Sequence, residues 1–143
     1  MFDSLLDNTS VPLLLEVTRF ASARHRAILS NVANAETPGY VTQDVSASEF
    51  RRQLQEASEA RDRRPAEGLA FRDSAHNRVD SDGRLRFTAF AAPDAGPARP
   101  DGNNVNLERE MVALTRNTML NNVTLELLRK QFATIRAAIS ERV

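Results

Sequence analysis

The chain has 143 residues, of which 41% are hydrophobic and 27% charged, and its formal net charge is zero. This length and composition are typical of a single folded domain, and the neutral charge disfavours nucleic-acid binding, which relies on a basic excess. Cysteine is absent, which excludes disulfides, thiolate nucleophiles and cysteine-ligated metals. Only 6% of the residues are aromatic and none is tryptophan, so we expect aliphatic helix seams rather than a core of large rings.

The N-terminal residues 1–15 show no pattern of a cleaved secretion signal. They lack a basic region and a long apolar run, and they include Asp3, Asp7 and Pro12. No stretch of the chain reaches the roughly 18–20 apolar residues that a membrane-spanning helix needs. We therefore expect any export from the cytoplasm to proceed without a cleaved signal peptide.

A first helix is predicted over residues 11–35. Ser10 is the expected N-cap, and Pro12 lies in the first turn, where proline is tolerated. Apolar residues recur at helical spacing and form one seam along this helix. The predicted seam consists of Leu14, Val17, Ala21, Ile28, Val32 and Ala35.

The end of this helix carries a turn and three spaced polar residues. The Pro-Gly pair at 38–39 predicts a type II turn over residues 37–40, with positive φ at the glycine. Asn31, Asn34 and Thr37 are three residues apart, which places them on roughly one face. These groups can cap the helix, hold the emerging loop, or bridge to another chain.

The middle of the chain, residues 41–105, is predicted to be largely irregular. Residues 51–68 mix charges of both signs and lack a sustained apolar stripe, so we expect a short exposed helix or a mobile, peripheral segment. A turn at residues 80–83, followed by alternating apolar residues over 85–90, predicts a small β-hairpin. Residues 91–102 contain three prolines and two glycines and are interpreted as a linker.

A second, longer helix is predicted over residues 107–141, with Asn106 as its N-cap. Its apolar positions alternate in steps of four and three, the heptad pattern of a coiled coil. The predicted seam consists of Leu107, Met111, Leu114, Thr118, Asn121, Leu125, Leu128, Phe132, Ile135 and Ile139. A helix of this length, roughly 50 Å, needs a partner, and the helix over residues 11–35 is the obvious one.

The predicted fold is therefore mainly α. The N-terminal helix and turn (residues 1–40) and the C-terminal helix (residues 106–143) pair as a coiled coil. The segment between them is irregular and contains a small β-hairpin.

The chain lacks the patterns that would predict catalysis. The two histidines, His25 and His76, are far apart and have no metal-ligand spacing. No nucleophile elbow and no glycine-rich phosphate loop occurs. Glu108 and Glu110 lie at a helix start, where stabilisation of the helix dipole explains them better than acid–base catalysis. We therefore expect no enzyme activity, no metal or cofactor, and no small-molecule substrate.

Two segments resemble known motifs. Residues 31–40 (NVANAETPGY) match the N-[IV]-A-N-x-x-T-P-G-[YF] motif of the axial proteins of the bacterial flagellar rod and hook. Residues 101–111 (DGNNVNLEREM) are similar to a segment of a proximal rod member of that family. The candidate assembly residues carried by these motifs are Asn31, Asn34, Thr37, Pro38, Gly39, Tyr40, Asp101, Gly102, Asn103, Asn104 and Val105.

The resemblance implies a structural subunit of the proximal rod of the flagellar basal body, a hollow drive shaft that spans the periplasm. Implied partners are other rod subunits, the rod–ring junction protein, the membrane-embedded ring and the flagellar type III export apparatus. The family often has a tyrosine where this chain places Asn121, and a polar residue on the seam costs stability but can fix register. The alternative is a cytosolic helical adaptor or an export-chaperone-like binding module.

Overall fold

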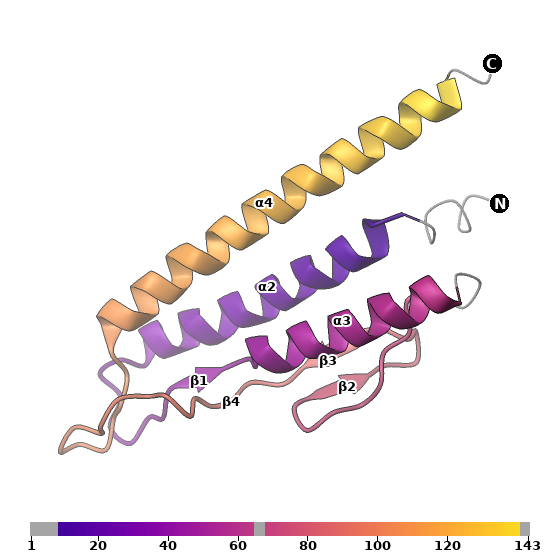
Figure 1. The fold of residues 1–143 in the computed structure, drawn as a ribbon. Helices are drawn as coiled ribbons and strands as arrows, with labels where there is room; N and C mark the ends of the chain where they lie inside the picture. The colour runs from indigo at the N-terminus through magenta and orange to yellow at the C-terminus, as the bar shows by residue number, and fades with distance from the viewer. Residues whose placement is uncertain (1–8, 65–67, 141–143) are drawn as a thin grey trace.

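The computed structural model describes residues 9–64 and 68–140. Within this part of the chain the helices are α2 (Val11–Ala33), α3 (Ala47–Arg63) and α4 (Leu107–Ser140). The strands are β1 (Gln43–Asp44), β2 (Asn77–Val79), β3 (Leu85–Phe87) and β4 (Phe90–Ala91). As Figure 1 shows, α2 lies between α4 on one side and α3 with the strands on the other.

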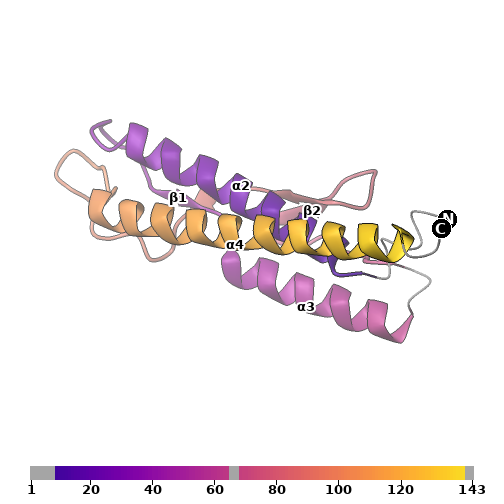
Figure 2. The same ribbon diagram turned by 90° about the horizontal axis from the view of Figure 1, so that it is seen from above.

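The two long helices confirm the prediction of a mainly α fold. α2 and α4 run antiparallel, and Figure 2 shows α4 passing over α2. Asn106 Oδ1 accepts a hydrogen bond from the Arg109 N–H at 3.1 Å, as an N-cap should. Ser10 occupies the N-cap position of α2 as predicted, but its side chain accepts no hydrogen bond from the first turn, and the Val11 N–H donates to Thr9 Oγ1 at 3.2 Å. Residues 1–8 and Glu141, the predicted end of the second helix, lie outside the described residues.

The face that α4 turns towards α2 differs from the predicted apolar seam. Its buried residues are Glu110, Asn117, Thr124 and Leu128. Half-buried residues at compatible spacing are Leu114, Asn121, Gln131 and Ile135. The predicted seam residues of α4 that are buried or half-buried in the structure are Leu114, Asn121, Leu125, Leu128 and Ile135.

Five predicted seam residues are exposed, so this part of the prediction is wrong for the isolated chain. They are Leu107 (48% exposed), Met111 (52%), Phe132 (46%) and Ile139 (42%), together with Thr118. Hydrogen bonds explain the difference, because Asn117 Nδ2 donates to the Ala21 carbonyl at 2.8 Å and Glu110 pairs with Asn31. These bonds rotate α4 so that a polar row faces α2.

The predicted seam of α2 agrees with the burial in the structure more closely than the predicted seam of α4 does. Ala21, Ile28 and Ala35 are buried, and Leu14 and Val32 are half-buried. Val17 is half-buried too, but it packs against the cluster around Phe20 and Phe50. On α4, Leu125 is also half-buried. The helix pairing is therefore real in this structure, but a complete apolar coiled-coil seam is not formed.

The hydrophobic core lies on the other side of α2, between α2, α3 and β3. Phe20 stacks on Phe50 with ring centroids 4.4 Å apart, and both rings meet Phe87 edge-on at 5.7 and 5.4 Å. Small and aliphatic side chains from neighbouring positions complete this cluster: Ala23, Ala27, Val45 and Leu85. The expectation of a core without large rings is wrong, because three of the few aromatic residues converge here.

α3 belongs to this core. Ser46 caps it by accepting a hydrogen bond from the Glu49 N–H at 3.2 Å, and Phe50, Gln53 and Ala57 are buried. Gln53 donates to the Arg72 carbonyl at 2.8 Å and accepts from the Asn77 amide at 2.7 Å. Of the two alternatives for this segment, the helix is right. Its expected peripheral position is wrong, because Phe50, Gln53 and Ala57 pack α3 on the core and the polar Gln53 is one of these buried residues.

The strands form two small antiparallel pairs. β2 and β3 form the predicted hairpin, whose turn is closed by Asp80 Oδ1 accepting from the N–H groups of Asp82 and Arg84. β1 pairs with β4, a contact that we did not predict. This pairing fastens the start of the middle segment to its end, next to the segment interpreted as a linker.

Glu16 of α2 is buried against β3 and is 6% exposed. Burial raises the pKa of its carboxyl group above its usual range, although Arg19 and a hydrogen bond from the Leu85 N–H oppose the shift. A raised pKa in the folded state means that protonation stabilises the fold. This stabilisation is complete below the unfolded pKa and is lost as the pH rises through the folded pKa.

Glu16→Gln is therefore expected to raise the free energy of unfolding at pH 7, since it removes a buried charge while it keeps an acceptor for the Leu85 N–H. Urea denaturation from pH 4 to pH 8 measures this. The difference from the unchanged protein should shrink towards the acid end, as Glu16 becomes neutral in both states. An equal difference at every pH would show that the charge is not the cause.

Candidate functional site

The structure brings the two sequence motifs together at the end of the molecule where α2 stops and α4 starts (Figure 1). The Gly39 N–H donates to the Asp101 carbonyl at 2.8 Å, and the Asn104 N–H donates to the Tyr40 carbonyl at 3.3 Å. Segments more than 60 residues apart thus share one hydrogen-bonded unit. We call its four asparagines, Asn31, Asn34, Asn103 and Asn104, the asparagine clasp.

Asn31 is the centre of the clasp and is 1% exposed. Its Nδ2 donates to the Gln43 carbonyl at 2.7 Å and to Glu110 Oε2 at 2.9 Å. Its Oδ1 accepts from the Gln43 N–H at 2.9 Å and from the Tyr40 hydroxyl at 3.1 Å. All four hydrogen-bonding positions of the amide are used, so this side chain joins α2, β1 and α4.

Asn103 closes the end of α2 from the other motif and is fully buried. Its Nδ2 donates to the carbonyls of Asn34 and Thr37 at 2.9 and 2.8 Å. Its Oδ1 accepts from the Val105 N–H at 2.7 Å. Carbonyls at a helix C-terminus have no partner within the helix, and here a distant asparagine supplies one.

The other two asparagines differ in how far along the chain their hydrogen-bond partners lie. Asn104 Oδ1 accepts from the N–H and the hydroxyl of Thr42 at 2.7 and 3.0 Å. Asn34 bonds locally, because its Nδ2 donates to the Ser30 carbonyl at 2.8 Å and its Oδ1 accepts from the Thr37 hydroxyl. Of the alternatives open from the sequence, capping and loop holding are therefore both present. Bridging to another chain stays a prediction.

The predicted type II turn is present. Gly39 has φ of 71°, and the Tyr40 N–H donates to the Thr37 carbonyl at 3.3 Å. Gly102 also has positive φ, 81°, and an added Cβ there would lie 3.3 Å from Gly39 Cα. The two glycines thus allow the two motif backbones to approach closely.

Gly102→Ala is expected to destabilise the chain more than Gly39→Ala does. Both place a side chain at positive φ, which costs about 1 kcal/mol. Only the first adds a contact with the backbone of the other motif, so we expect about 1 kcal/mol more. Urea unfolding of the two variants tests this, and equal losses would mean that the close approach does not matter.

Two arginines contribute to the site without being predicted. Arg24, which interrupts the apolar seam of α2, forms a bidentate ion pair with Asp44 of β1, with N–O distances of 2.9 and 2.8 Å. Arg99 donates to the Ala35 carbonyl at 2.6 Å and to the Val105 carbonyl at 3.2 Å. Arg24 could have been found as a charge on an apolar face, whereas Arg99 carries no such signal.

The asparagine clasp connects α2, β1 and the start of α4, and its polar groups hydrogen-bond with one another. His25 and His76 stay apart, and His76 stacks on Phe90 at 4.0 Å. Glu110 accepts from Asn31, so it does more than stabilise the helix dipole. Over residues 9–64 and 68–140, no three His, Asp or Glu side chains cluster as metal ligands would. None of the described helices is both long and apolar enough to cross a bilayer.

The most unusual surface lies on α4. Large apolar residues are exposed along the side turned away from α2, at spacings of four and seven residues that keep them on one face. We call this set the outer stripe: Val112, Met119, Leu120, Val123 and Leu127, which are 40–69% exposed. The exposed members of the predicted seam lie on a second side of the same helix. A helix that is apolar on several sides is normally buried by neighbours.

Comparison with known proteins identifies similar chains. No protein-family model matches. The chain is 29% identical over 120 residues to a protein of Aeromonas hydrophila named "Flagellar basal body rod protein FlgB", a match that covers 82% of this chain and 83% of that protein. It is 27% identical over 124 residues to the proteins of the same name from Escherichia coli K12 and Shigella flexneri, covering 81% of this chain.

The similarity to these rod proteins confirms the resemblance that the two motifs predicted. It extends well beyond the motifs, since about four fifths of the chain is covered in each match. The relatives are named as rod proteins of the flagellar basal body, in agreement with the structural role expected for this chain.

Proposed function

We propose that this chain is a structural subunit of the proximal rod in the bacterial flagellar basal body. The observation that carries the proposal is the outer stripe of α4, a row of large apolar side chains that the isolated chain leaves exposed. Exposed apolar patches of this kind mark surfaces that bind other proteins. The similarity to proteins named as rod proteins supports a rod as the assembly.

In this proposal α2 and α4 form the unit that assembles. The outer stripe and the exposed residues of the predicted seam, such as Met111 and Phe132, offer contacts on two sides of α4. Contacts between different surfaces of like subunits need not close and can build a tube. The coiled-coil packing expected from the heptad pattern is completed by helices of neighbouring subunits.

The asparagine clasp has a supporting role in this proposal. It fixes the start of α4 against the end of α2 through buried hydrogen bonds from Asn31 and Asn103. A long helix fastened at one end presents its outer stripe in a fixed direction. The motif residues therefore act by positioning the helices rather than by touching a ligand.

The proposed partners are other rod subunits, the rod–ring junction protein, the membrane-embedded ring and, during export, the flagellar type III apparatus. The proposed location is the part of the basal body that spans the periplasm, reached without a cleaved signal peptide. The relatives' names support the basal body as the location.

The test is complementation of a strain that lacks this subunit. Val123→Asp places a charge in the outer stripe, where Val123 is 54% exposed, so the monomer should fold but motility should be lost. Asn122→Asp adds the same charge one residue earlier, at an exposed polar position, and should swim normally. Normal swimming of Val123→Asp would contradict the proposal and favour an adaptor or chaperone-like module.

A further inference from the structure

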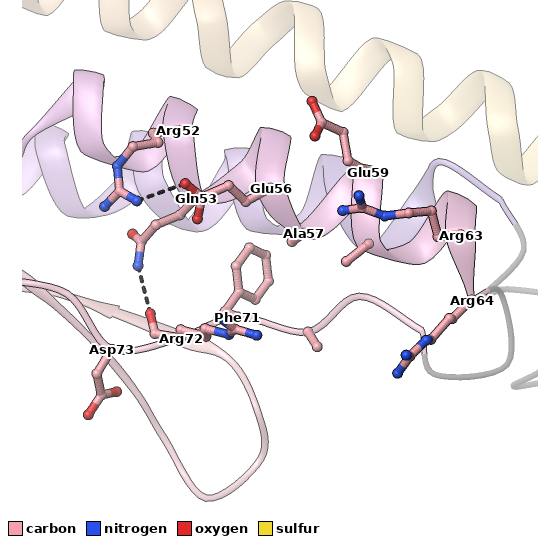
Figure 3. Close-up of a pocket in the computed structure, with 12 residues that line it drawn as sticks. Arg52, Gln53, Glu56, Ala57, Glu59, Arg63, Arg64, Phe71, Arg72 and Asp73 are labelled. Atoms are coloured by element: carbon pink, nitrogen blue, oxygen red, sulfur yellow. Dashed lines mark hydrogen bonds and ion pairs between the residues drawn. The ribbon is translucent and has the colours of Figure 1, made fainter.

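A groove of about 590 Å³ lies between α3 and the extended residues 70–73. Its floor is apolar and small, and Figure 3 shows the Phe71 ring pointing towards α3. The floor is formed by Ala57, Ala60, Ala70 and Phe71. Four arginines line the groove: Arg52, Arg63, Arg64 and Arg72.

The carboxylates of the groove are already engaged. Glu56 pairs with Arg52 at 2.9 Å, and Glu59 accepts from Gln55 at 2.9 Å. Asp73 accepts from the Val79 N–H at 2.8 Å, and in Figure 3 its side chain points away from Phe71. The donors to Glu59 and Asp73 are neutral, so both carboxylates keep their charge, and the groove is lined by four arginines and three carboxylates.

Arg63 and Arg72 flank Phe71 from opposite walls, the first from α3 and the second from the extended segment (Figure 3). Among the described residues, neither guanidinium has a carboxylate within ion-pair distance. Guanidinium groups bind carboxylates through paired hydrogen bonds that specify geometry as well as charge. The groove therefore presents two positive charges, from Arg63 and Arg72, with the apolar ring of Phe71 between them.

We propose that this groove binds a short acidic segment of another protein. Carboxylates of the segment pair with Arg63 and Arg72, and an apolar side chain between them rests on Phe71 and the alanine methyl groups. A free inorganic anion would leave this apolar floor unused, which is why a peptide fits better. The groove is separated from α4 by α3 (Figure 3), so this surface is distinct from the outer stripe and does not depend on the proposed function.

The test uses the full-length protein and a fluorescent peptide probe of eight residues in which glutamate and leucine alternate. Fluorescence anisotropy at low ionic strength should show saturable binding that weakens as salt is added. The double variant Arg63→Gln, Arg72→Gln should bind at least about tenfold more weakly, as expected for the loss of two charge-assisted contacts. Far-ultraviolet circular dichroism of each variant verifies that the fold is retained.

The matched control removes Arg78 and Arg86, two exposed arginines that face each other across the β2–β3 pair, outside the groove. The variant Arg78→Gln, Arg86→Gln loses the same charge and should bind within about twofold of the unchanged protein. Equal weakening in both double variants would overturn the proposal by showing diffuse charge attraction. Equal binding of a probe with glutamine in place of glutamate, or displacement by inorganic phosphate at equal concentration, would also overturn it.

Discussion

Asn31→Asp is expected to lower the free energy of unfolding by about 3–5 kcal/mol, a large part of the total stability of a domain this size. The new carboxylate would replace an amide that is 1% exposed and that donates to Glu110 and to the Gln43 carbonyl. Two favourable contacts become repulsive at a site that is closed to bulk solvent. Urea denaturation followed by circular dichroism measures the loss.

A reciprocal change isolates the contact with Glu110. In the double variant Asn31→Asp, Glu110→Gln the donor and the acceptor exchange places, so we expect at least half of the lost stability to return. The deficit of the single variant should also shrink in acid, because protonation of either carboxyl restores a donor. A double variant as unstable as Asn31→Asp alone would show that the two side chains do not interact as described.

Leu128→Asp is expected to cost about 3–5 kcal/mol, because Leu128 is 7% exposed and packs on the side of α4 that faces α2. The informative comparison is Phe132→Asp. The heptad pattern places both residues on one seam, but Phe132 is 46% exposed in the structure. We therefore expect Phe132→Asp to cost less than about 1 kcal/mol in the isolated chain.

The same urea assay decides between the two faces of α4. Equal large losses in both variants would mean that the apolar seam, not the polar face, meets α2 in solution. Equal small losses would mean that α4 is not docked on α2 at all. Only the unequal result agrees with the rotation of α4 set by Asn117 and Glu110.

Local chemistry allowed much of the fold to be predicted. The Pro-Gly pair after α2 and the cap at Asn106 mark helix ends through the backbone alone, and both predictions hold. The hairpin turn at Asp80 is equally local. The proximity of the two motifs, by contrast, could not be read from spacing, since it depends on chain reversal over more than 60 residues.

The incorrect predictions share a physical cause. Each concerns polar groups whose hydrogen-bond partners lie far away in the sequence. Gln53 and Asn117 count as polar in any periodicity, yet both are buried, with amide donors satisfied by backbone carbonyls from other elements. The β1–β4 pairing involves two residues on each side and has no local signal. Hydrophobic patterns therefore located α2 and α4 correctly, but they did not locate α3 and did not determine which side of α4 faces inward.

In the proposed function, neighbouring subunits cover the outer stripe of α4 in the assembled rod. The chain contains no cysteine, so Val123→Cys introduces a single thiol into that stripe, and Ser81→Cys supplies a control in the exposed hairpin turn. The measurement is the rate of maleimide labelling in the isolated protein and in purified basal bodies. We predict that Cys at position 123 reacts readily in the isolated chain and is protected in basal bodies. Equally fast labelling of position 123 in both preparations would contradict the account.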